Sequence, residues 1–116
     1  MEDKLNIIVA CSGASNTGSY SDLVARKLMQ SGKAKMLCLA RFAVDENFVE
    51  QTKKDMYNYK DIIVIDGCPI NCAEKIIQKL EVNDYVHKSI TDFGIEKGKT
   101  PVTPEKINEI VESLIC

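Results

Sequence analysis

Residues 62–72 read Ile-Ile-Val-Ile-Asp-Gly-Cys-Pro-Ile-Asn-Cys, a branched apolar run followed by a turn that carries two cysteines. The apolar run is typical of a buried strand, and the amphipathic residues after the turn predict a helix over 72–80. Asn71 could cap this helix, with Glu74 in the capping-box position, or Pro69 could open it one turn earlier. Both starts stay open at this point.

The same alternation of strand and helix extends to both sides of this stretch. Apolar runs predict strands at 5–10, 36–40 and 84–90, and helices are predicted at 19–30, after the N-cap Asp45, and from Pro104 after the N-cap Thr103. The first helix is expected to bury Tyr20, Leu23, Val24 and Leu28. Four strands alternating with helices predict an α/β fold: one three-layer domain over residues 1–116, with a mostly parallel sheet in the order 2-1-3-4 and helices on both faces.

Composition and charge exclude several classes of function. The chain has 15 basic and 17 acidic residues among 116, so no basic surplus is available for a nucleic-acid backbone. The longest apolar run is too short to cross a bilayer, so no membrane association is expected. The charged start, residues 1–4, leads directly into a predicted strand, which favours a cytoplasmic protein without a signal peptide. The oligomeric state stays open.

Five cysteines are many for a protein of a reducing compartment, where metal binding or thiol chemistry explains them better than disulfides. In the predicted strand order, Cys11, Cys38 and Cys68 lie at or near the carboxyl ends of neighbouring strands, where ligands bind in such sheets. Cys72 follows Cys68 by one turn. We therefore predict a zinc site formed by Cys11, Cys38, Cys68 and Cys72, although Cys38 could instead be a core residue of its strand. Four thiolates can also hold an iron–sulfur cluster.

Several neighbouring residues have predicted supporting roles. Asp66 could accept a hydrogen bond beside the metal or cap the turn, and His87 is interpreted as a structural residue of the fourth strand. Helix amino termini that follow the first and third strands would stabilise thiolates. The loop 12–18 is either a simple turn or a cradle of N–H groups for a small anion. Cys116, the last residue, is left out of the site.

These residues together resemble the DGC-domain family of small bacterial and archaeal proteins. The resemblance runs from residue 5 to about 100 and rests on five motifs: Asp66-Gly67-Cys68, Cys11-Ser12-Gly13, Cys38-Leu39-Ala40, Cys72, and Asp92-Phe93-Gly94-Ile95. It implies zinc binding through four cysteines, which map onto Cys11, Cys38, Cys68 and Cys72. It implies no substrate, so whether the protein is an enzyme stays open.

Two other functions remain as alternatives. A strand that ends in Cys11 and continues into a small polar loop is similar to the phosphocysteine loop of phosphotransferase-system IIB domains. A low-molecular-weight phosphatase needs an arginine six residues after its nucleophile, and Thr17 stands there instead. Persulfide or thiol-redox chemistry at Cys11 is a variant, although the Cys68–Cys72 spacing is not that of thioredoxin-like proteins. In the second alternative the protein is an interaction domain with thiols in its core.

Overall fold

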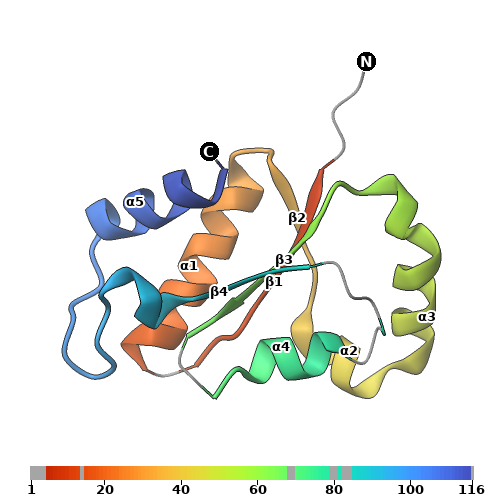
Figure 1. Ribbon diagram of the computed structural model, residues 1–116, viewed down its shortest axis with the longest axis horizontal. Coiled ribbons are helices and arrows are strands. Elements are labelled where there is room, and N and C mark those ends of the chain that lie inside the picture. The colour runs from red at the N-terminus through yellow and green to blue at the C-terminus, as the bar shows by residue number, and fades with distance from the viewer. Residues whose placement is uncertain (1–4, 14, 68–69, 79–80, 82–84, 116) are drawn as a thin grey trace.

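A computed structural model describes residues 5–13, 15–67, 70–78, 81 and 85–115. Figure 1 shows a central sheet with helices on both sides. The strands are β1 (Asn6–Ala10), β2 (Ala34–Met36), β3 (Ile62–Asp66) and β4 (Val86–Ser89), and the α-helices are α1 (Asn16–Gln30), α2 (Leu39–Val44), α3 (Glu46–Asp55), α4 (Cys72–Ile77) and α5 (Pro104–Ile115). Short 3-10 helices span Met56–Asn58 and Ile90–Phe93.

The strands of the described residues form one parallel sheet in the order β2-β1-β3-β4. The predicted order and the parallel pairing are therefore confirmed. Ala10 lies opposite Ile65, and Asp66 lies opposite Ser89. Because these pairs are level, the carboxyl ends of β1, β3 and β4 meet at one edge of the sheet.

Apolar side chains fill the space on both faces of the sheet, as the prediction of a three-layer fold requires. One core lies between the sheet and helices α1 and α5, and includes Ile8, Tyr20, Leu28, Ile65 and Ile110. The other lies between the sheet and helices α2, α3 and α4, and includes Ile7, Val9, Phe42, Val64 and Ile77. We call the second face of the sheet the α4 face. Of the residues expected to be buried on α1, Leu23 is 37% exposed.

Side-chain caps fix the starts of three helices. Asp45 accepts the N–H of Phe48 at the start of α3, and Thr103 accepts the N–H of Lys106 at the start of α5, so both predicted N-caps are confirmed. Ser15 caps α1 by accepting the N–H of Gly18. This cap explains why α1 begins at Asn16, three residues before its predicted start.

The second strand is shorter than predicted. It ends at Met36 rather than at residue 40, and the residues after Cys38 form α2. Burial of Phe42 against the α4 face favours the helix, as does the ion pair of 3.0 Å between Arg41 and Asp45 one helical turn apart. The prediction that Cys38 lies within the strand is therefore wrong.

Candidate functional site

The three cysteines in the part of the chain that the structure describes all follow the carboxyl ends of neighbouring strands. Cys11 comes directly after β1, donates its N–H to the carbonyl of Ile65 at 2.9 Å, and packs half-buried on the α4 face. Cys38 is exposed at the N-cap position of α2, two residues after β2. Cys72 is exposed at the first position of α4. β2, β1 and β3 are adjacent in the sheet, so these three cysteines lie along the same carboxyl edge.

Proximity to one edge does not by itself make a metal site. Within residues 5–13, 15–67, 70–78, 81 and 85–115, no three His, Cys, Asp or Glu side chains form a group that could hold a metal ion. Cys11, Cys38 and Cys72 are therefore not brought together as three ligands. Cys68, the fourth residue of the predicted set, lies outside the described residues.

A buried carboxylate connects the end of β3 with the start of α4. Asp66 is 1% exposed, and its Oδ1 and Oδ2 accept the N–H groups of Ala73 at 2.7 Å and Glu74 at 3.1 Å. These are the second and third residues of α4, so Asp66 caps the helix across the intervening turn. Asn71 stands at the N-cap position in a left-handed conformation, and its side chain makes no capping hydrogen bond. The helix thus starts at Cys72, and Asp66 provides the cap.

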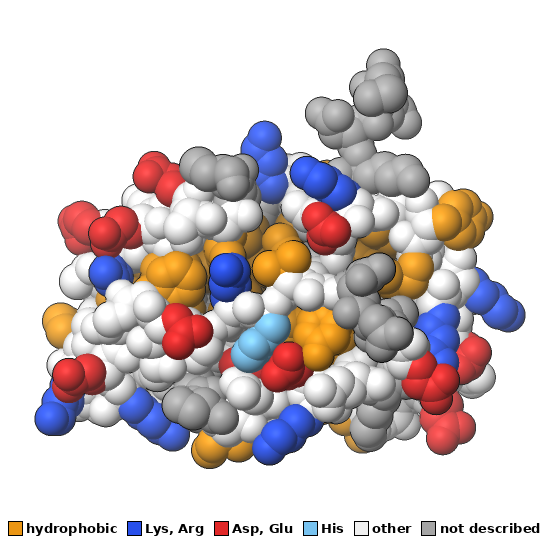
Figure 2. Space-filling view, in the orientation of Figure 1, with side chains coloured by type: hydrophobic (Ala, Val, Ile, Leu, Met, Phe, Trp, Pro, Cys, Tyr) orange, Lys and Arg blue, Asp and Glu red, His pale blue; other side chains and the backbone are white. Residues whose placement is uncertain are grey.

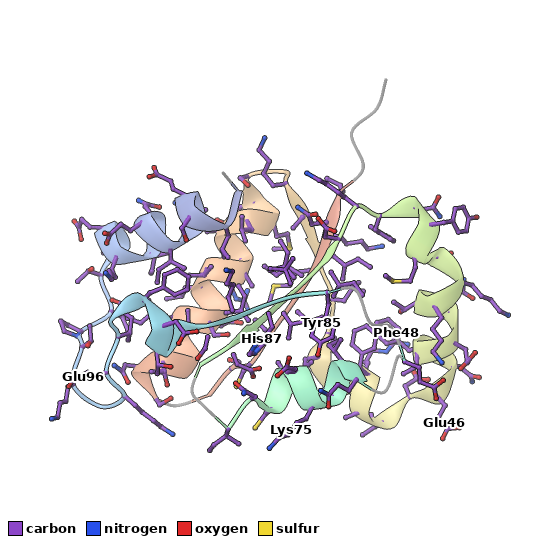
Figure 3. All side chains as sticks on the ribbon, in the orientation of Figure 1. Glu46, Phe48, Lys75, Tyr85, His87 and Glu96 are labelled. Atoms are coloured by element: carbon purple, nitrogen blue, oxygen red, sulfur yellow. The ribbon has the colours of Figure 1, made fainter. Side chains whose placement is uncertain are left out.

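His87 of β4 completes the hydrogen bonding of this carboxylate. Its Nε2 lies 2.8 Å from Oδ2 of Asp66, and its Nδ1 lies 3.8 Å from Oε2 of Glu74. Tyr85 donates its hydroxyl to the same Glu74 oxygen at 2.9 Å. Figure 3 shows Tyr85 and His87 above α4, and Figure 2 shows the histidine, pale blue, at the surface beside acidic side chains. We call Asp66, Glu74, Tyr85 and His87 the edge network.

The register of the sheet places the edge network on the α4 face. His87 lies opposite Val64, two residues before Asp66, so the side chains of His87 and Asp66 project from the same face. Tyr85, two residues before His87, packs in the core of that face. Residues from β3, β4 and α4 therefore converge at the edge where the cysteines lie.

The edge network changes the electrostatics expected for this edge. The sequence predicts that the positive amino terminus of α4 stabilises thiolates. In the structure, the N–H groups of Ala73 and Glu74 are already bound to the carboxylate of Asp66. These two N–H groups at the start of α4 are therefore not free to face the thiol of Cys72.

The loop after Cys11 packs closely on the start of α1. A Cβ on Gly18 would lie 2.8 Å from the backbone nitrogen of Gly13, so only glycine fits at position 18. The N–H groups of Gly18 and Ser19 donate to the side chain and carbonyl of Ser15, respectively. One N–H group of the predicted anion cradle, that of Gly18, is therefore used within the protein.

The sequence comparisons agree with this fold and these motifs. The family model of the DGC domain matches residues 7–114. The chain, an α/β protein with cysteines after its parallel strands, therefore belongs to the DGC domain family. It is also similar to the anaerobic and virulence modulator AnvM of Pseudomonas aeruginosa, with 27% identity over 96 residues, which are 83% of this chain and 71% of AnvM. No solved structure gives a significant match.

The structure specifies the roles of two residues that the sequence had left general. Asp66 was expected either beside a metal or as a cap, and the structure shows it as the cap of α4. His87 was interpreted as structural, and its contact with a buried carboxylate at the cysteine edge was not expected. The predicted adjacency of strands 3 and 4 could have revealed the contact. It would have done so only with the register in which Asp66 lies opposite Ser89.

Proposed function

We propose that the protein binds zinc at the carboxyl edge of its sheet through Cys11, Cys38, Cys68 and Cys72. The donor chemistry fits: thiolates are the ligands of structural zinc, and three of these cysteines follow the ends of adjacent strands. Adjacent strands are about 4.8 Å apart. Cysteine side chains at the ends of adjacent strands can therefore reach a common tetrahedral site. When bound, the zinc ion would neutralise thiolate charge and link the strand ends.

The observation that carries this proposal is the buried carboxylate of Asp66, which accepts the N–H of the residue next to Cys72. Reactive nucleophilic thiolates occur in electropositive surroundings. On this turn the N–H groups of Ala73 and Glu74 are bound to Asp66, so they do not provide such surroundings for Cys72. A bound divalent cation instead offsets the charges of both carboxylate and thiolates.

The number of ligands determines what such a site can do. Four thiolates close the coordination sphere and favour a structural or sensing role, whereas three leave a position for water. The name of the Pseudomonas relative describes an anaerobic and virulence modulator. We extend to this chain the modulating role that this name states.

Elemental analysis of protein purified without oxygen tests the proposal. Wild-type protein should contain about one zinc ion per chain, and a Cys68→Ser/Cys72→Ser double variant should lose it. Cys116→Ser is the matched control, because this cysteine is outside the proposed site, and it should keep the metal. Iron with sulfide would identify a cluster instead. Metal-free wild-type protein under reducing conditions would refute the proposal, and alkylation of Cys11 would then test the thiol-enzyme alternative.

A further inference from the structure

The carboxylate of Asp66, which caps α4, is itself hydrogen-bonded by the side chain of His87. From the described part of the chain, Asp66 accepts three hydrogen bonds, two from α4 and one from the ring of His87. Because an ionised carboxylate only accepts, the Nε2 atom of His87 carries the proton of the 2.8 Å bond. His87 is the only one of these donors that is a side chain, so it is the donor that a substitution can remove.

Removing that donor would leave Oδ2 of a 1% exposed carboxylate with one remaining donor among the described residues, the N–H of Glu74 at 3.1 Å. A buried carboxylate that loses a charge-assisted hydrogen bond shifts toward water or toward another donor. Either shift moves the atom that orients Ala73 and Glu74. Cys72 immediately precedes Ala73, so the direction of its Cα–Cβ bond depends on the same cap.

We propose that His87 is a positioning residue for the thiol of Cys72, and that it acts by holding Asp66 in its capping position. This inference rests on the proposed zinc site and adds a residue that the cysteine motifs do not include. His87 touches neither the metal nor a thiol in this role. It fixes the edge strand β4 to the end of β3 and to the first turn of α4 through one carboxylate.

Two variants, one in β4 and one directly before it, isolate the effect. His87→Phe removes the donor to Asp66 and keeps a planar ring. Tyr85→Phe removes the donor to Glu74 from the same face, at the residue directly before β4, and leaves the bond between His87 and Asp66 untouched. His87→Gln is the conservative variant, because its side-chain amide can present an N–H to Asp66 in place of Nε2–H.

The first readout is amide hydrogen exchange in metal-free, reduced protein. His87→Phe should speed exchange at Ala73 and Glu74, while Tyr85→Phe and His87→Gln should leave these two amides close to wild type. The second readout is zinc affinity, measured by competition with a chromophoric chelator. His87→Phe should weaken binding by about 10–100-fold, as is usual when the residues that orient a ligand are lost, and His87→Gln should restore most of it.

Each result decides a separate point. Unchanged exchange at Ala73 and Glu74 in His87→Phe would overturn the inference, because the cap would not depend on His87. Faster exchange with wild-type zinc affinity would overturn it too, since the thiol of Cys72 would not be positioned through the cap. Equal losses in Tyr85→Phe would indicate general loosening of β4, and would also count against it. If wild-type protein binds no zinc, the proposed function fails, and the exchange data alone decide whether His87 positions α4.

Discussion

Gly67 and Thr17 are in such close contact that a Cβ on Gly67 would lie 2.9 Å from both the carbonyl carbon and the carbonyl oxygen of Thr17. The glycine of the Asp-Gly-Cys motif therefore brings the turn after β3 against the first turn of α1. No side chain fits between these two backbones. The contact explains the glycine independently of any metal.

Gly67→Ala should destabilise the protein by about 1–3 kcal/mol, because two backbone segments must move apart to admit one methyl group. Chemical denaturation with circular dichroism measures the change. Gly13→Ala is the matched control, since a Cβ there meets nothing within 4 Å, and it should change stability by less than about 0.5 kcal/mol. Similar values for the two variants would show that the contact with Thr17 is not tight.

Asn71 adopts φ 58° and ψ 46°, in the left-handed region. Asn71→Ala should cost up to about 2 kcal/mol, because asparagine tolerates the left-handed region better than alanine does, and Asn71→Gly should be at least close to wild type, because glycine has no Cβ. Thermal unfolding of the reduced, metal-free variants measures both. An alanine variant as stable as the glycine variant would contradict the left-handed backbone before Cys72.

Cys38→Ser should separate folding from metal binding. Cys38 is the N-cap residue of α2 and makes no side-chain capping bond, whereas serine is among the preferred caps. We expect the metal-free variant to be as stable as wild type or up to about 1 kcal/mol more stable, with weaker zinc binding. Unfolding curves and chelator competition on the same sample test this. Unchanged zinc affinity would remove Cys38 from the ligand set.

Asp45 gives α3 a dependence on acid pH. The side-chain hydrogen bond from Arg41, followed by the backbone bond from Phe48, holds the pKa of Asp45 below its ordinary value of 3.8. Since the folded-state pKa is lowered, its stabilisation is complete above 3.8 and is lost as the pH falls through the lower folded value. Carboxyl and amide chemical shifts of α3 should therefore change together in that range.

Asp45→Asn is the control for this titration, because asparagine caps helices without a charge. The variant should keep α3 at neutral pH and lose the coupled shift below 3.8. If α3 in the variant still responds to acid as it does in wild type, the dependence comes from another group.

The order of the sheet followed from the sequence because each strand is a short apolar run with a helix after it. The caps Asp45 and Thr103 were predictable since each acts on residues three positions away. The end of β2 was not: residues 36–40 are apolar and suit either a strand or a helix, and the burial of Phe42 decides in favour of α2. The local sequence pattern could not decide between strand and helix here, because the packing of Phe42 decides it.

The candidate site likewise has one part that local sequence predicts and one part that it does not. The placement of Cys11 and Cys72 after strand ends follows from local sequence, and the structure has both there. The bond between Asp66 and His87 joins residues 21 positions apart and depends on the register of two parallel strands. A shift of that register by one residue would point His87 to the opposite face, and no local pattern fixes it.

The dual position of Asp66 also has a consequence for how the protein opens. Its backbone belongs to the ladder between β3 and β4, while its side chain holds α4. β4 cannot leave the sheet without taking the ring of His87 away from that carboxylate. β4 and α4 should therefore unfold as one cooperative unit, at a free energy below that of global unfolding. This local unfolding would expose the turn between β3 and α4 to solvent.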